Sequence, residues 1–263
     1  VIPGEMLFEK LGITCTAPIP GHDIAALKRA LRVCLKADGP TLLHVVTKKG
    51  KGYEPAEENP SKFHGIGPYD IATGEVKKGS SSAPKYTSVF SKAIVAEAER
   101  DHDIVAITAA MKDGTGLAAF SEKFPKRFID TGIAEEHAVA LASGLALGGK
   151  KPVVCIYSTF MQRAFDQLVI NNALADTNVV FCLDRAGLVG DDGPTHHGVF
   201  DIVYGRMVPA VRMMALSDEA ELVHMLHTAL ALEGPVILRW PRGEARGVEL
   251  PAVPQVLEEG ESR

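Results

Sequence analysis

The sequence has no apolar run of the roughly 18–20 residues that a membrane-spanning helix requires, so we expect no contact with a membrane. It also has no excess of basic residues. With 28 Lys and Arg against 33 Asp and Glu, the net charge is −5, which argues against general binding to nucleic acid. The N-terminus has no Met and no signal-peptide pattern, and we expect it to be the interior of a longer chain.

Cysteine is scarce, with only Cys15, Cys34, Cys155 and Cys182. Their spacing fits neither a zinc motif nor a dense disulfide framework. Because Cys155 and Cys182 lie in apolar, strand-like segments, we expect buried thiols in a reducing cytoplasm. The Gly-rich dinucleotide and nucleotide motifs GxGxxG and GxxxxGK[ST] are absent, as is the GxSxG motif of serine hydrolases.

The apolar fraction of 46% over 263 residues is enough to bury a core, in one large domain or two modest ones. Residues 1–85 resemble the end of one domain, with a helix over 23–37 and a buried strand over 41–47. A linker rich in Pro, Gly and Ser follows over 54–86, and its most favourable boundary is at 79–84.

From residue 86 onward, short β-branched runs alternate with helical patterns, which predicts an α/β fold with a parallel sheet. The predicted strands are 104–108, 127–130, 152–157, 178–184, 211–215 and 235–239. The predicted helices are 88–100, 117–124, 135–148, 161–175 and 217–232.

Polar residues follow several predicted strands, where a parallel sheet binds ligands. Glu135 and Glu136 open a helix, either as two acids that complement the helix dipole or as a buried acid that exchanges a proton with a ligand. Residues 157–163 combine hydroxyls with Arg163, an arrangement that suits an anion. The loop 184–198 is rich in Gly, Asp and His, although no metal-ligand set around His196 and His197 is complete.

Together these stretches resemble one family, the 1-deoxy-D-xylulose-5-phosphate synthases. The resemblance runs in order through residues 7–12, 21–23, 47–56, 63–64, 133–138, 157–166, 184–187, 192–196 and 241–243. It implies a transketolase-like fold that binds thiamine diphosphate and Mg²⁺. The implied reaction condenses pyruvate with D-glyceraldehyde 3-phosphate and releases CO₂, for isoprenoid, thiamine and pyridoxal biosynthesis.

The resemblance also implies roles for individual residues. Glu135 would share a proton with N1′ of the cofactor pyrimidine. Tyr53 and Phe160 would contact the cofactor, and His64, Asp192 and His196 would lie near the reacting carbons. Tyr157, Arg163, Arg185 and Arg242 would line the acceptor pocket, and the two arginines at 185 and 242 would bind the triose phosphate. Lys48, Lys49 and Lys51 form either a phosphate-binding or a solvated basic loop.

The family's Gly-Asp-Gly motif for diphosphate and metal is absent, so no metal ligand is expected in this chain. The resemblance therefore divides it into the end of the diphosphate-binding domain (1–85), the pyrimidine-binding domain (86–258) and the start of a linker to a missing C-terminal domain (259–263). The missing segment would lie upstream or on a second chain. A homodimer is expected, in the cytoplasm or, for a plant protein, the plastid stroma.

Two other classes remain open. A transketolase or a 2-oxoacid dehydrogenase β-subunit would share the pyrimidine-binding domain, but residues 157–160 and 192–196 favour the synthase. A non-catalytic scaffold would have no physical need for the set Glu135, Arg185 and Arg242.

Overall fold

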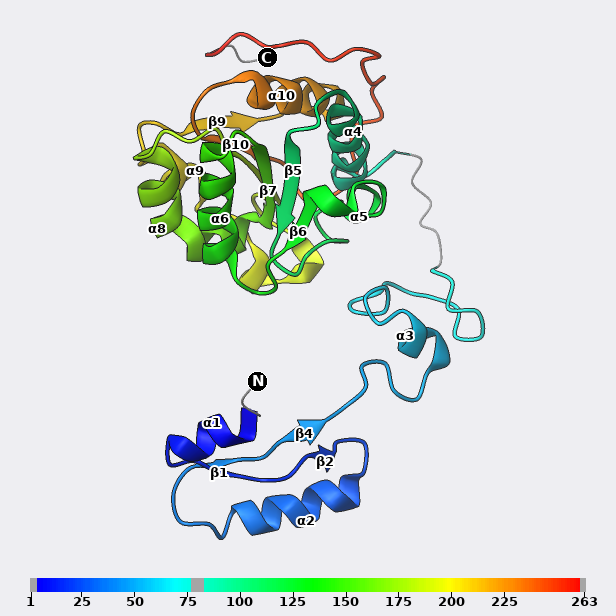
Figure 1. The fold of residues 1–263 in the computed structure, drawn as a ribbon. Helices are drawn as coiled ribbons and strands as arrows, with labels where there is room; N and C mark the ends of the chain where they lie inside the picture. The colour runs from blue at the N-terminus through cyan, green and yellow to red at the C-terminus, as the bar shows by residue number, and fades with distance from the viewer. Residues whose placement is uncertain (1–3, 77–82, 261–263) are drawn as a thin grey trace. The chain divides into compact units, whose positions relative to one another are not determined.

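The computed structural model describes residues 4–76 and 83–260, and the chain separates into two compact units, Val1–Gly79 and Ser80–Arg263 (Figure 1). Within the described ranges, no helix combines the length and the apolar character needed to cross a membrane.

The second unit is built on a six-stranded parallel sheet with the strand order β6-β5-β7-β8-β10-β9. The predicted parallel α/β fold is therefore confirmed. The strands are β5 (Ile104–Thr108), β6 (Phe128–Asp130), β7 (Lys151–Tyr157), β8 (Val180–Asp184), β9 (Arg212–Ala215) and β10 (Val236–Arg239). The long helices are α4 (Tyr86–Arg100), α6 (Glu135–Leu147) and α10 (Glu219–Ala231).

Helices cover both faces of this sheet, and successive strand residues alternate between two cores. Ala106, Val153 and Cys182 face α4 and α10, whereas Ile107 and Val154 face α6. Because both faces are buried, the strands are continuous apolar runs, which is why the sequence predicts them well. Cys155 and Cys182 are neighbours in the register of β7 and β8 and are fully buried free thiols, as expected.

The strand order places a topological switch at the carboxyl ends of the central strands. The chain leaves β5 to form β6 on one side and returns to form β7 on the other. In open parallel sheets, the crevice beyond such a switch is where ligands bind. The short helix α5 (Ala118–Lys123) and the 3₁₀ turn η1 (Pro125–Arg127) connect β5 to β6.

The helix predicted over 161–175 is wrong in detail. The chain instead forms α7 (Ser158–Met161), the 3₁₀ turn η2 (Gln162–Ala164), α8 (Phe165–Gln167) and the π-helix η3 (Leu168–Ala173). The buried Asn172 amide donates to the Gln167 carbonyl at 3.0 Å, which favours the wider turn. Apolar periodicity does not distinguish these helix types. It also missed α9 (Asp201–Arg206) and the 3₁₀ turns η4 (Gly190–Asp192) and η5 (Pro194–His196).

The first unit contains little regular structure. It consists of α1 (Gly4–Lys10), α2 (Ile24–Cys34), α3 (Glu54–Glu58) and four two-residue strands, β1 (Thr14–Cys15), β2 (Ile19–Pro20), β3 (Thr41–Leu42) and β4 (Val45–Val46). The buried strand predicted over 41–47 is therefore wrong, because Val45 and Val46 are exposed. The predicted linker contains α3, and part of the proposed boundary, 79–82, lies outside the described residues.

A buried acid holds the segment that follows β10 in place through hydrogen bonds to its backbone. The Glu219 carboxylate, fully buried at the start of α10, accepts hydrogen bonds from the backbone N–H groups of Arg246, Gly247 and Val248 at 2.6–3.1 Å. Burial acts to raise the pKa of Glu219, but these backbone donors outweigh it and hold the pKa below its ordinary value of 4.5. The carboxylate therefore stabilises the fold in its ionised form.

Replacing this acid by glutamine (Glu219→Gln) is expected to lower the free energy of unfolding at neutral pH by about 1–3 kcal/mol, since one charged acceptor oxygen at this buried position is replaced by an NH₂ group that faces backbone N–H donors. A carboxyl with a lowered folded-state pKa stabilises above about pH 4.5 and loses that contribution as the pH falls. The difference from wild type should thus shrink between about pH 7 and pH 3 in urea titrations. The exposed control Glu122→Gln should change little, and a pH-independent difference would contradict this account.

Candidate active site

The predicted residues of the second unit lie at the carboxyl ends of the parallel strands. Tyr157 ends β7, Asp184 ends β8 with Arg185 next, and Arg242 follows the end of β10 by three residues. Glu135 begins α6 after β6. Side chains from four segments of the chain therefore gather at one edge of the sheet.

A column of stacked side chains forms the centre of this edge. The Arg185 guanidinium lies over the buried Tyr157 ring, 3.9 Å from its centroid. The Phe160 ring stacks on Tyr157 with centroids 5.7 Å apart, and His196 meets Phe160 edge-on at 5.3 Å. Burial raises the pKa of Tyr157 to about 12, so its hydroxyl stays protonated at neutral pH.

One acid joins the two arginines predicted to bind phosphate. An Asp192 carboxylate oxygen lies 3.0 Å from Arg242 Nε and 3.7 Å from Arg185 Nε. These side chains are separated by up to 57 positions in the sequence, and the loops after β8 and β10 bring them together. The two guanidinium groups share this one carboxylate, and their planar N–H donors are of the kind that bind phosphate oxygens.

The structure also distinguishes the two acids at the start of α6. Glu135 is 3% exposed and its carboxylate lies 3.1 Å from Arg163 Nη1, whereas Glu136 is only half-buried. The Arg163 side chain is 54% exposed, so this partner can move away when a ligand arrives. The neighbouring His137 is exposed. Burial and the Arg163 contact therefore distinguish Glu135 from Glu136.

Sequence reasoning included Asp184 in a motif but gave it no role, and it missed Thr87. Asp184 is fully buried and accepts a 2.6 Å hydrogen bond from the Thr87 hydroxyl. Burial raises the pKa of Asp184, against the opposing effect of Arg185. The backbone of Arg185 has φ +60°, a left-handed conformation that costs a non-glycine residue about 1–2 kcal/mol. No local sequence pattern reveals a strained arginine.

The remaining two predicted residues, Tyr53 and His64, belong to the first unit, so their part in this site stays a prediction. The Tyr53 hydroxyl donates to the Ile71 carbonyl at 2.8 Å, and its ring packs on Phe63 with centroids 5.4 Å apart. His64 is exposed.

The basic loop of the same unit is partly neutralised by its own acid. Lys48 Nζ lies 2.6 Å and Lys51 Nζ 3.7 Å from carboxylate oxygens of Glu57. The hydrogen bond from Lys48 and one from the Gly52 backbone lower the pKa of Glu57 to about 2. This arrangement favours the solvated-loop interpretation of the lysines over phosphate binding.

Over residues 4–76 and 83–260, no group of three or more His, Cys, Asp or Glu side chains is arranged to hold a metal ion. His197 Nδ1 accepts from the Val189 backbone N–H at 3.2 Å, and His196 Nδ1 lies 2.9 Å from the Thr195 hydroxyl. The two histidines therefore have other partners.

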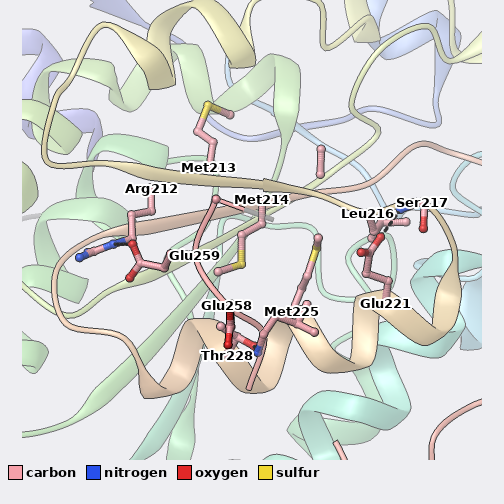
Figure 2. A pocket seen from close by; sticks show the side chains of 13 residues that line it. Arg212, Met213, Met214, Leu216, Ser217, Glu221, Met225, Thr228, Glu258 and Glu259 are labelled. Atoms are coloured by element: carbon pink, nitrogen blue, oxygen red, sulfur yellow. Dashed lines mark hydrogen bonds and ion pairs between the residues drawn. The ribbon is translucent and has the colours of Figure 1, made fainter. Parts of the chain in front are cut away.

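A cavity of about 620 Å³ lies elsewhere, between β9, α10 and residues 257–260 (Figure 2). Met214 and Met225 line its middle, and the Arg212–Glu259 ion pair lies at one end with 3.0 Å between Nε and the carboxylate. None of the predicted site residues lines it. The cavity is therefore separate from the residues gathered at the strand ends.

Comparison with known families gives two matches. Residues 82–248 match the transketolase pyrimidine-binding domain family, and residues 1–47 match the N-terminal part of the 1-deoxy-D-xylulose-5-phosphate synthase family. Among curated proteins, the 1-deoxy-D-xylulose-5-phosphate synthase of Magnetococcus marinus is 56% identical over 263 residues, and that of Syntrophomonas wolfei is 53% identical over 264. These alignments cover 100% of this chain but only 42% and 41% of the relatives, so the chain spans about two fifths of their length.

Solved structures of transketolases share the fold. A split-gene transketolase, an inactive β4 tetramer, superposes with a TM-score of 0.59 at 26% identity and covers 66% of this chain and 57% of its own. The transketolase of Campylobacter jejuni gives a TM-score of 0.60 at 18% identity, covering 95% and 50% of the two chains. At such low identity the second match shows the fold alone.

Proposed function

Since the chain belongs to the transketolase-type family of 1-deoxy-D-xylulose-5-phosphate synthases, we propose that it supplies the pyrimidine- and acceptor-binding half of that enzyme's active site. The proposed reaction condenses pyruvate with D-glyceraldehyde 3-phosphate and releases CO₂, giving 1-deoxy-D-xylulose 5-phosphate. The single observation that carries this proposal is the placing of Asp192, Arg185 and Arg242 together beside the Tyr157–Phe160 stack.

The residues present fit the pyrimidine end of thiamine diphosphate. A flat aminopyrimidine needs an aromatic surface and a carboxylate beside a ring nitrogen, and Phe160 and the buried Glu135 supply groups of these two kinds. When bound, the cofactor supplies the carbon nucleophile of this enzyme class. Glu135 would hold a proton shared with N1′, and burial of its carboxylate would keep water from competing for that proton.

The diphosphate end has no comparable site among the described residues, since no acidic cluster suited to a cation is present there. We therefore assign Mg²⁺ and the diphosphate to the segment that the relatives carry upstream, or to a second chain. The two guanidinium groups would bind the triose phosphate, and Tyr157 and Arg163 would complete the acceptor pocket. Asp192 and His196 would lie near the reacting carbons. Tyr53 and His64 would contribute from the first unit.

We also propose a homodimer in the cytoplasm. Helix α6 is rich in Ala, and large apolar side chains are exposed at its end and just after the π-helix that contacts it, with Leu147 73% and Leu174 77% exposed. A second copy packed on this surface would bury both side chains. Light scattering on the wild-type chain should give twice the monomer mass, and Leu147→Glu should reduce it; a wild-type monomer at high concentration would count against a dimer.

The choice of donor tests the function against its nearest alternatives, a transketolase or a 2-oxoacid dehydrogenase β-subunit. The complete enzyme that includes this chain should form 1-deoxy-D-xylulose 5-phosphate from pyruvate and D-glyceraldehyde 3-phosphate, and should turn over a ketose phosphate donor far more slowly. Preference for the ketose phosphate would favour a transketolase. A folded, cofactor-loaded enzyme without turnover of either donor would favour a scaffold.

A further inference from the structure

The position of Arg185 in the anion site depends on contacts that hold it in an unfavourable backbone conformation. Its φ of +60° is one of only three such values at non-glycine positions among the residues that the structure describes. Strained backbone persists where neighbouring groups fix it, and it is concentrated at functional sites. Neighbouring groups must therefore hold the backbone of Arg185 in this conformation.

The buried acid directly before it contacts both its backbone and its side chain. Asp184 Oδ1 accepts a 2.6 Å hydrogen bond from the Arg185 backbone N–H and lies 3.1 Å from Arg185 Nη1. The other oxygen, Oδ2, accepts a 2.6 Å bond from the hydroxyl of Thr87, near the start of α4. Helix α4 therefore orients the carboxylate, and the carboxylate orients the arginine.

A second contact fixes the same nitrogen from the loop after β5. Arg185 Nη1 donates to the Gly114 carbonyl at 2.8 Å, and the guanidinium plane rests on the Tyr157 ring. A side chain at position 114 would collide with Tyr157, because an added Cβ would lie 2.1 Å from its hydroxyl oxygen. Glycine at this position lets the loop approach closely enough to hold the guanidinium.

These bonds use Nη1 and leave another edge of the guanidinium to the site. Arg185 Nε is buried and has no hydrogen-bond partner among the described residues, and it lies 3.7 Å from Asp192. Through the edge formed by Nε and Nη2, a guanidinium can donate parallel hydrogen bonds to two oxygens of a phosphate. Arg185 Nε is thus a buried donor without an acceptor, and it lies beside a second arginine. A ligand oxygen would supply the missing acceptor.

We propose that Asp184 is the positioning residue of the anion site. Through its bonds to Thr87 and Arg185 it presents the Nε–Nη2 edge to the acceptor's phosphate, and so gives the enzyme its preference for a phosphorylated aldehyde. Asp184 itself touches no substrate. This inference rests on the proposed function, because it assumes that the anion is the phosphate of the acceptor.

The test compares two acceptors in the complete enzyme, D-glyceraldehyde 3-phosphate and D-glyceraldehyde. Replacing Asp184 by asparagine keeps the volume but removes one acceptor oxygen and the charge. In Asp184→Asn, the ratio of kcat/KM for the phosphorylated over the unphosphorylated acceptor should fall about 10-fold, as expected for loss of one charge-assisted contact. The KM for pyruvate and the activity with D-glyceraldehyde should stay within about 2-fold.

A second acid provides a matched control. Asp201 is 1% exposed, accepts from the next backbone N–H (Ile202) at 2.8 Å, and bonds Arg239 Nε at 2.8 Å, but it does not contact Arg185. Asp201→Asn should lower the melting temperature while leaving the acceptor ratio unchanged. If Asp184→Asn fails to fold, Thr87→Val removes only the orienting hydroxyl and should lower the ratio about 3-fold.

The outcomes separate this inference from the proposed function. A wild-type enzyme that prefers the phosphorylated acceptor, together with a lowered ratio in Asp184→Asn and Thr87→Val, supports it. Equal loss of activity with both acceptors would overturn it and leave the proposed function intact, since Asp184 would then act only on stability. A wild-type enzyme without any preference for the phosphorylated acceptor would overturn the proposed function as well.

Discussion

Replacing Glu135 by glutamine is expected to lower kcat of the complete enzyme by at least about 100-fold, the usual contribution of a positioned acid or base. Glutamine keeps the shape and can accept a hydrogen bond, but it cannot hold and release a proton. The Glu135 carboxylate lies buried at the first turn of α6, with Arg163 as its partner. Steady-state turnover with pyruvate and D-glyceraldehyde 3-phosphate measures the effect.

The neighbouring acid is the control for this experiment. Glu136 has the same chemistry and the same helix, but it is only half-buried. Glu136→Gln should therefore keep kcat within about 3-fold of wild type. Nearly normal turnover in Glu135→Gln, or equal losses in both variants, would remove the catalytic role from Glu135.

The second large effect is expected on acceptor binding. Arg242→Met keeps most of the side-chain length but removes the guanidinium that lies 3.0 Å from Asp192. A hydrogen bond to a charged group contributes about 1.5–3 kcal/mol, so KM for D-glyceraldehyde 3-phosphate should rise about 10–150-fold. KM for pyruvate should change little, because the acceptor alone carries phosphate.

Arg212 offers a closely matched control. Its Nε also lies 3.0 Å from a carboxylate, that of Glu259, and its side chain is 41% exposed against 39% for Arg242. It lines the cavity beside β9 rather than the strand ends. Arg212→Met should leave both KM values unchanged, whereas equal effects of the two substitutions would indicate a general charge effect instead of a phosphate site.

The alternation of strands and helices from residue 86 onward could be predicted because the inner strands β5, β7, β8 and β10 are buried on both faces. A short β-branched run such as residues 104–108 then fits few structures other than a buried strand. The positions of the candidate residues after strands also followed from the sequence, since parallel strands end at one edge.

Other features depend on contacts between distant segments, which periodicity does not contain. The π-helix depends on Asn172, whose side chain contacts both the Gln167 and Val139 carbonyls. Asp192 meets Arg242 only through the fold, and the role of Asp184 depends on a hydroxyl 97 positions away. Burial then separated Glu135 from Glu136, which the sequence alone distinguished only by resemblance.

The most direct test of the account is a reconstitution assay with pyruvate, D-glyceraldehyde 3-phosphate, thiamine diphosphate and Mg²⁺. It would compare this chain alone, the chain joined to the remaining segments of a relative, including the one that carries the Gly-Asp-Gly motif, and that joined protein with Glu135→Gln. The account predicts 1-deoxy-D-xylulose 5-phosphate only from the joined protein with Glu135 intact. Equal product from the chain alone, or undiminished product from the Glu135→Gln protein, would contradict it.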